Sequence, residues 1–491
     1  MSYELHKFKQ GDILTASALN EMDAGIYDAD VDLRRGESNG SIQQEGYDTV
    51  DKNGNPAKTL GAIASGNGAV AFGGQRFDKI GNCATLEEAL QKQEDEGLEK
   101  TPSVEPITEA RGEQSFAAGG GNIIDGPWSA GFGKDNTTYQ RAAFVYGGSC
   151  RAGCTEEEYT KYNDVIKATT DKTNYASSYS LSHAGGDQSA AIGRVSHVEG
   201  RQVIAYGFCS HGEGDNTRAI GQYSHVEGFM SATGELDENL DIVGSGEASH
   251  AEGYHTTTTG KAAHAEGTYS LASGSSAHAE GLHASAIGEA SHAEGSYSKT
   301  LGRYSHAEGL RTIAGDVADT NAEANAEAAH AEGVDTKAAA RAAHAEGNNT
   351  TASGRFAHSE GYKTEASGES SHAEGSNCIA SASNSHAGGS GSVAAKAGSF
   401  VHGQGLAVGA NYAASFGKYN EGGNNLFEVG AGASDDQRKT VFLVASNGNI
   451  GIYNWANKKV YSLYHLFATL DAFSKAESKY PTAAVIKEYD F

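Results

Sequence analysis

Residues 264–274 read His-Ala-Glu-Gly-Thr-Tyr-Ser-Leu-Ala-Ser-Gly, and residues 278–288 repeat the pattern as His-Ala-Glu-Gly-Leu-His-Ala-Ser-Ala-Ile-Gly. Each 14-residue unit has two halves, and each half ends in small-x-small-x-Gly. Small residues alternate with a period of two before each glycine, which is typical of a strand and not of a helix. We expect the glycine to supply the positive φ of a tight corner. The stretch therefore predicts two short strands and two corners per unit, which form one flat coil of a β-roll.

The same phrase recurs along the middle of the chain. Successive units start 14 residues apart, except after His225 (25 residues) and after His306 (24 residues). A short fixed period with small insertions predicts a solenoid. The histidines that open the phrases are His183, His197, His211, His225, His250, His264, His278, His292, His306, His330, His344, His358, His372 and His386. A glutamate follows two residues later in all but the first and last: Glu199, Glu213, Glu227, Glu252, Glu266, Glu280, Glu294, Glu308, Glu332, Glu346, Glu360 and Glu374. Gly185 and Gly388 take the glutamate's place at the two ends.

Alternation also predicts which side chains face inward. The inward set contains only small residues, such as Ala277, Ala279, Ala284 and Ala286, and in the next unit Ser291, Ala293, Ser298 and Thr300. Such a thin core buries little apolar area to offset the entropy of ordering the chain, which favours oligomerisation. One outward strand carries the invariant His and Glu. The other carries changing residues and is expected to face solvent, with the pairs Arg218/Ile220, Leu271/Ser273, Lys299/Leu301 and Glu365/Ser367.

The coils at 189–193 (Ser-Ala-Ala-Ile-Gly) and 217–221 (Thr-Arg-Ala-Ile-Gly) resemble the head repeat of trimeric autotransporter adhesins of the YadA type. The Ser-His-Ala-Glu-Gly form is similar to repeats in bacteriophage tail fibres. The resemblance covers about half of the chain and implies a left-handed parallel β-roll that trimerises. The fold expected is thus an all-β solenoid, a trimeric roll of 14-residue coils with short helical segments at both ends and in insertions.

The remaining sequence suggests an order of segments. These are an N-terminal attachment segment (1–36), degenerate coils with inserted helices (37–182), the His-x-Glu-Gly shaft (183–420), a β-strand connector (421–457) and a C-terminal cap with helices (458–491). Helices are expected at 15–26, 85–97, 155–172 and 462–475, and from Pro481 onward. Loops are expected at 37–60 and in the insertions at 235–244 and 317–327, and a hairpin at 441–449.

Flanking coils lack the histidine. In coils ending at Gly119, Gly133 and Gly147, aromatic residues take the positions later held by His and Glu. Beyond His386, Phe400 occupies the His position and His402 the Glu position.

Composition narrows the possible partners. The net charge of −26 argues against nucleic acid, because phosphate binding needs a basic face. The sequence shows no signal peptide and no apolar run long enough for a membrane span, so membrane insertion is not expected. The odd, scattered cysteines (Cys83, Cys150, Cys154, Cys209 and Cys378) favour reduced thiols and assembly in the cytoplasm.

The His/Glu ladder is the main chemical signal, and three interpretations stand. The preferred one is structural: hydrogen bonds between the His and Glu of neighbouring chains line a trimer seam. A metal or anion column on a shared axis is the second, and a solvent-exposed ladder is the third. No catalytic residue, cofactor or metal ligand is assigned, because an active site needs a unique constellation and the carboxylates here repeat. Asp237, Asp241, Asp316 and Asp319 in the insertions are read as surface acids, with calcium binding or glycoside hydrolysis as the lesser alternative.

The resemblance to phage tail fibres implies a non-enzymatic fibre of a phage or phage-like tail, assembled in the host cytoplasm and located in the virion tail. Its partners would be two further copies of the chain, tail or baseplate proteins at the N-terminal segment, and a glycan or protein receptor on a bacterial surface. A bacterial trimeric surface adhesin is the alternative, followed by a tailspike glycan hydrolase.

Overall fold

The structure, a computed structural model, describes residues 33–35, 42–44, 48–50, 56–60, 62–72, 75–76, 108–155, 181–236, 242–315, 326–454 and 459–462. It is an all-β parallel solenoid, as expected. One short 3-10 helix, η2 (Asp435–Gln437), is the only helix in these residues. No helix in the described ranges is long and apolar enough to cross a membrane. The chain forms two compact units, residues 1–262 and 263–491.

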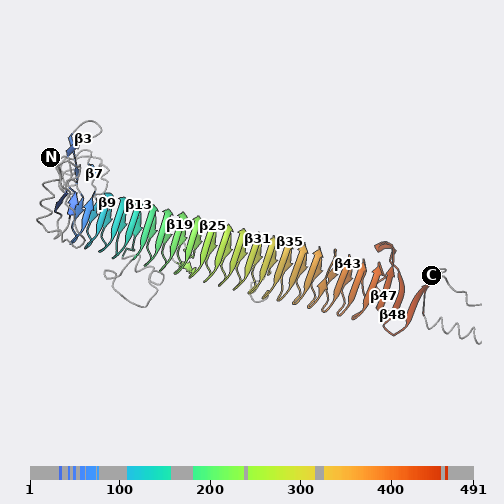
Figure 1. Ribbon diagram of the computed structural model, residues 1–491. Coiled ribbons are helices and arrows are strands. Elements are labelled where there is room, and N and C mark those ends of the chain that lie inside the picture. Colours follow the sequence, from blue (N-terminus) through green and yellow to red (C-terminus); the bar gives the residue numbers. More distant parts are fainter. Residues whose placement is uncertain are drawn as a thin grey trace, which may run out of the picture. The chain divides into compact units, whose positions relative to one another are not determined.

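Most coils of the second unit have one long strand, usually of five residues, and one short strand of two residues, and strands of each kind pair in parallel with the next of that kind (Figure 1). His264 pairs with His278, and Leu271 with Ser285. The long strands are β27 (His264–Thr268), β29 (His278–Leu282), β31 (His292–Ser296), β33 (His306–Leu310), β35 (His330–Val334), β37 (His344–Asn348), β39 (His358–Tyr362), β41 (His372–Ala373), β43 (His386–Ser390), β45 (Phe400–Gln404) and β46 (Ala414–Lys418). The short strands are β28 (Leu271–Ala272), β30 (Ser285–Ala286), β32 (Lys299–Thr300), β34 (Ile313–Ala314), β36 (Lys337–Ala338), β38 (Thr351–Ala352), β40 (Glu365–Ala366), β42 (Ile379–Ala380) and β44 (Val393–Ala394).

An antiparallel sheet ends the second unit. It comprises β47 (Asn425–Ala431), β48 (Thr440–Ala445), β49 (Ile450–Asn454) and β50 (Lys459–Ser462). β47 also pairs in parallel with β46, which joins the last coil to this sheet. The expected hairpin at 441–449 is therefore present as β48 and β49. Glu428 is buried here and accepts hydrogen bonds from Gly423 N (2.9 Å) and the Asn425 side chain (2.5 Å), so its carboxylate is satisfied.

The first unit has the same two ladders. Its long strands are β6 (Val70–Phe72), β9 (Phe116–Gly120), β11 (Ala130–Lys134), β13 (Phe144–Gly148), β15 (His183–Asp187), β17 (His197–Arg201), β19 (His211–Asp215), β21 (His225–Phe229) and β25 (His250–Tyr254). Its short strands are β5 (Ile63–Ala64), β8 (Glu109–Ala110), β10 (Ile123–Ile124), β12 (Thr137–Thr138), β14 (Arg151–Ala152), β16 (Ala190–Ala191), β18 (Ile204–Ala205), β20 (Arg218–Ala219), β22 (Ala232–Thr233) and β26 (Thr257–Thr258). The coils that carry aromatic residues at the His and Glu positions share the register of the coils that carry histidine, because Phe144 pairs with His183.

Two loop predictions are wrong. Residues 37–60 contain β2 (Ile42–Gln44), β3 (Asp48–Val50) and β4 (Pro56–Leu60), alongside β1 (Leu33–Arg35) and β7 (Gln75–Arg76). Most of their pairings are antiparallel, although β2 also pairs in parallel with β6. The insertion after His225 contains an antiparallel pair, β23 (Glu235–Leu236) and β24 (Ile242–Gly244). The polar composition of both segments concealed strands that pair with local neighbours. The expected helices lie outside the described residues, apart from Thr155 and Ser462 at two of their ends, and so does most of the insertion at 317–327.

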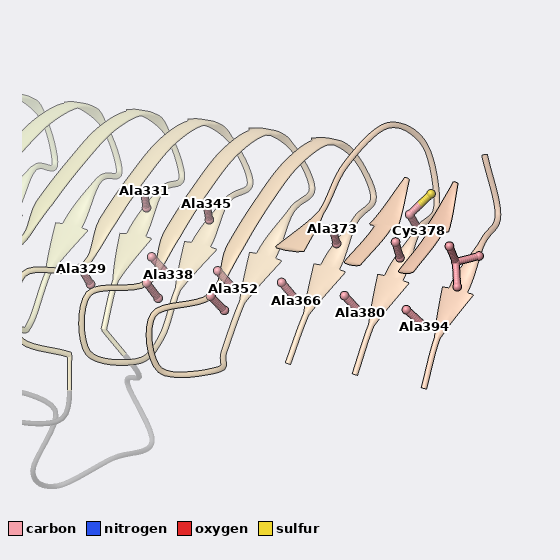
Figure 2. Packing of buried hydrophobic residues seen from close by; sticks show 14 of the residues in the cluster. Ala329, Ala331, Ala338, Ala345, Ala352, Ala366, Ala373, Cys378, Ala380 and Ala394 are labelled. Atoms are coloured by element: carbon pink, nitrogen blue, oxygen red, sulfur yellow. The ribbon is translucent and has the colours of Figure 1, made fainter. Parts of the chain in front are cut away.

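The inward set is as predicted. Ala279, Ala284, Ala286 and Ala293 are fully buried in the second unit. Figure 2 shows the alanines of long strands, such as Ala331, and of short strands, such as Ala338, in the interior of the coil. Many inward hydroxyls are paired: Ser291 donates to the Gly288 carbonyl (2.7 Å), and Thr300 donates to Ser291 (2.8 Å). The interior is therefore thin and filled mainly by small residues, although larger side chains such as Val401 and Leu406 are also buried in it.

The prediction that the outward residues at the short strands face solvent is wrong for Ile220, which is only 2% exposed. A Cβ built on Gly234 would lie 2.9 Å from the Cβ of Ile220. The chain thus turns into the insertion directly over Ile220 and removes it from solvent.

The corners also differ from the prediction. Gly281 has a φ of +116°, as expected, but the second glycine of the coil does not have a positive φ. Gly288 is needed for space instead, since a Cβ there would lie 2.0 Å from the Gly302 carbonyl oxygen. The left-handed corner positions belong to other residues, among them Ser276 (φ 55°) and Ala290 (φ 49°). A non-glycine residue in this region costs about 1–2 kcal/mol, so each corner stores strain.

Replacing Ala286 by Leu should lower the free energy of unfolding by about 1–3 kcal/mol or more, because three carbons must enter a filled interior. Ser285→Leu, the matched control on the outward side of the same strand, should change it by less than about 0.5 kcal/mol. Urea denaturation checks both. Equal effects of the two substitutions would contradict the inward assignment.

Gly288→Ala should destabilise the protein by about 1–3 kcal/mol, since its methyl group would overlap the backbone of the next coil. Ala290→Gly should leave stability unchanged or raise it slightly, because relief of the left-handed strain offsets the added chain entropy. Thermal unfolding of the two variants measures this. A destabilising Ala290→Gly would show that the corner carries no strain.

Candidate functional site: the His/Glu face

The outward side of the long strands forms a repeating face in each unit, which we call the His/Glu face. Its residues are the His and Glu of each His-x-Glu-Gly phrase. Both side chains are about one third exposed, for example 35% at His278 and 30% at Glu280. Parallel pairing in register puts each His beside the next His and each Glu beside the next Glu. The structure thus brings the predicted residues together in columns.

The imidazole rings stack on one another. Their centroids lie between 4.5 Å (His183 and His197) and 5.0 Å (His292 and His306) apart, which is the spacing of neighbouring strands. The planes of His278 and His292 differ by only 1°. The insertions do not break the columns, because His225 stacks on His250 within the first unit and His306 on His330 within the second.

At several of these histidines, Nε2 lacks a hydrogen-bond acceptor at normal distance within its own chain. The glutamate of the same phrase lies 3.6 Å from Nε2 at His278 and 4.0 Å at His211, which is beyond normal hydrogen-bond length. Buried Nε2 atoms with no hydrogen-bond partner in the described residues belong to His183, His197, His225, His278, His292, His306, His330, His344, His358, His372 and His386. A buried polar atom without a hydrogen-bond partner costs free energy. Binding of another molecule that brings acceptors to this face would therefore be favourable.

Burial and neighbouring histidines lower the pKa of several ladder imidazoles. Burial is the larger cause at His278, followed by repulsion from a protonated His292 or His264, while Glu280 and Glu266 act in the opposite direction. The pKa values of His183, His197, His211, His330 and His358 are lowered for the same two leading reasons. These lowered pKa values favour the neutral form of the six rings near neutral pH.

A lowered His pKa in the folded state means that the unfolded chain binds more protons just below pH 6.5. The free energy of unfolding should therefore be constant from about pH 8 to 7 and fall as the pH drops from about 6.5 to 5. Denaturant unfolding at a series of pH values tests this. His278→Gln, which removes one titrating ring, should reduce the slope. Stability that rises as the pH falls would contradict the neutral stack.

Aromatic residues extend the His/Glu face in each unit. In the first, Phe116, Phe132 and Phe144 follow one another at 5.1 and 5.9 Å, and Phe144 lies 4.9 Å from His183. In the second, Phe400 stacks on His386 at 4.4 Å, and Phe416 lies 5.6 Å from Phe400. Phe132 is 40% exposed and Phe416 is 39% exposed. The sequence analysis placed these residues correctly.

Gly185, at the start of the His phrases, allows a contact that skips one coil. A Cβ on Gly185 would lie 2.2 Å from the ring of Tyr146, so the missing side chain leaves room for that ring. The Tyr146 hydroxyl donates to Glu199 Oε1 at 2.9 Å across the gap. Loss of water contact and this hydrogen bond raise the pKa of Tyr146.

Gly388, at the end of the phrases, opens a second gap, and here three ionisable groups meet. Glu374 Oε1 lies 3.4 Å from His386 Nε2 and 3.4 Å from His402 Nδ1. A Cβ on Gly388 would lie 2.5 Å from His402 Nδ1 and 2.8 Å from Glu374 Oε1. The sequence analysis missed this cluster, although Gly388 at a Glu position and His402 one coil later were its signal.

The other candidate groups stay apart. Cys150, Cys209 and Cys378 form no disulfide, and Cys150, Cys154 and Cys378 are buried. Asp237, Asp241, Asp316 and Asp319 lie outside the described residues, so their interpretation as surface acids stays a prediction. The seam of hydrogen bonds between chains also stays a prediction.

The chain matches no protein-family model, and no curated protein is a significant match to its sequence.

Proposed function

We propose that the chain forms a homotrimeric fibre, a left-handed roll of 14-residue coils in which the His/Glu faces of three copies meet around one axis. The observation that carries the proposal is the column of buried, partnerless Nε2 atoms repeated on the long strands. A neutral imidazole with a protonated Nε2 is a donor, and the nearest acceptors in its own strand are too far away. Glutamates of a neighbouring copy would supply acceptors at every coil.

The aromatic rows support the same face as the contact surface. Phe132 and Phe144 in the first unit, and Phe400 and Phe416 in the second, are each 38–40% exposed. Rows of large apolar side chains on a regular face are typical of protein–protein contacts. Their burial would add the apolar area that the alanine interior lacks, at about 25 cal/mol per Å².

We further propose that this fibre belongs to a phage or phage-like tail, is attached through its N-terminal segment, and binds a bacterial surface without catalysis. The rigid corners hold exposed tyrosines, such as Tyr297 (54%) and Tyr304 (56%), which suit recognition. Three copies would display each such residue three times, so that weak contacts multiply.

Sedimentation and light scattering of the native protein test the trimer. We expect a mass of three chains of 50.9 kDa each and a high frictional ratio. The double variant Phe400→Glu and Phe416→Glu should shift the mass toward one chain, because it places charges in the proposed contact. The matched control Tyr297→Glu, at an exposed corner, should remain trimeric. A monomeric wild type, or a control as disruptive as the double variant, would overturn the proposal.

A further inference from the structure

The gap over Gly388 differs in kind from the rest of the His/Glu face. Elsewhere neighbouring rings are nearly parallel, with planes 1–16° apart. At the last of the His phrases, the ring of His386 is turned 80° from that of His372 and stacks on Phe400 instead. Phe400 therefore holds His386 in an orientation that no other ladder histidine has.

We propose that Glu374, His386 and His402 form a binding site for a divalent transition-metal ion of the Zn²⁺ class. Each residue offers one ligand atom, and the three atoms lie within 4.8 Å of one another. Both distances to the carboxylate oxygen are 3.4 Å. Ligands at about 2.0–2.1 Å from a tetrahedral ion are separated by about 3.4 Å, so little movement is needed.

Two features show why this cluster suits an ion and its neighbours do not. In face-to-face rings such as those of His278 and His292, equivalent nitrogens are separated by about the ring spacing of 4.7 Å, and two ligands at about 2.0–2.1 Å from one ion cannot be that far apart. The ring centroids of His386 and His402 are 6.1 Å apart and the ring planes differ by 24°, so the rings are offset, and they present different nitrogens, Nε2 and Nδ1, to the same carboxylate oxygen. They can therefore flank one ion.

The chemistry of the donor set also fits. Two imidazoles and one carboxylate are borderline ligands that suit Zn²⁺ and Co²⁺, and three protein ligands leave a position for water. His386 Nε2 is buried and has no aligned hydrogen bond, although the carboxylate is near. The absent side chain at Gly388 provides the space. The site lies within one chain, so it does not depend on the proposed trimer.

The test uses metal-free full-length protein titrated with Co²⁺, followed by visible absorption, with displacement by Zn²⁺. We expect one tight site per chain with the intense bands of four- or five-coordinate cobalt. His402→Ala should weaken that site by more than the roughly 10–100-fold that loss of an outer-shell partner costs. Gly388→Ala should weaken it as well, because the methyl group fills the gap.

Glu346→Gln is the matched control, since it removes the equivalent carboxylate from an uninterrupted part of the stack and should leave the tight site intact. Circular dichroism of each variant shows that it folds, and His402, half exposed, should be replaceable without unfolding. The proposal is overturned if no tight site appears, if the ratio is one ion per three chains, or if both His402→Ala and Gly388→Ala bind as the wild type does.

Discussion

The close approach of neighbouring backbones at the glycine corners constrains the whole solenoid. Successive coils touch where Gly288 meets the carbonyl of Gly302, and the space left there is less than one methyl group. This contact fixes the register, so every residue sits beside its counterpart in the next coil. The thin coil fills most of its interior with alanine, serine and threonine, and only a few larger residues such as Val198 and Val401 are buried in it. Each coil therefore buries little apolar area, and regular backbone pairing and the outer face have to supply further stability.

The His/Glu face follows from that register. A residue type that occurs once per coil becomes a column when coils stack at strand spacing. Columns of like charge repel, and the lowered pKa of His278, caused by burial and by the adjacent histidines, favours the neutral ring. At each end of the series of His phrases, a glycine replaces the glutamate, and a different side chain uses the space that it leaves. Tyr146 reaches across Gly185 to Glu199, and His402 reaches across Gly388 to Glu374.

The sequence was sufficient to predict what depends on periodicity. The alternation of small residues identified Ala279 and Ala286 as interior, and the spacing of the histidines identified their stacking partners. It was insufficient where the period breaks. The strands at 42–44 and 48–50 lie in polar sequence, and the burial of Ile220 depends on an insertion that folds back over it. The corner conformation of Ala290 has no compositional signal, because steric limits of the coil impose it against the preference of the residue. The cluster at Gly388 could be predicted only by considering three successive coils together, because Glu374, Gly388 and His402 each lie in a different coil.

The tolerance of the ladder to insertions has a genetic consequence. His306 still stacks on His330, although the intervening sequence is ten residues longer than a standard repeat. Each coil thus behaves as an exchangeable cassette whose two faces are alike. Unequal recombination between neighbouring repeats would delete or duplicate whole coils without a change of reading frame or of pairing partner.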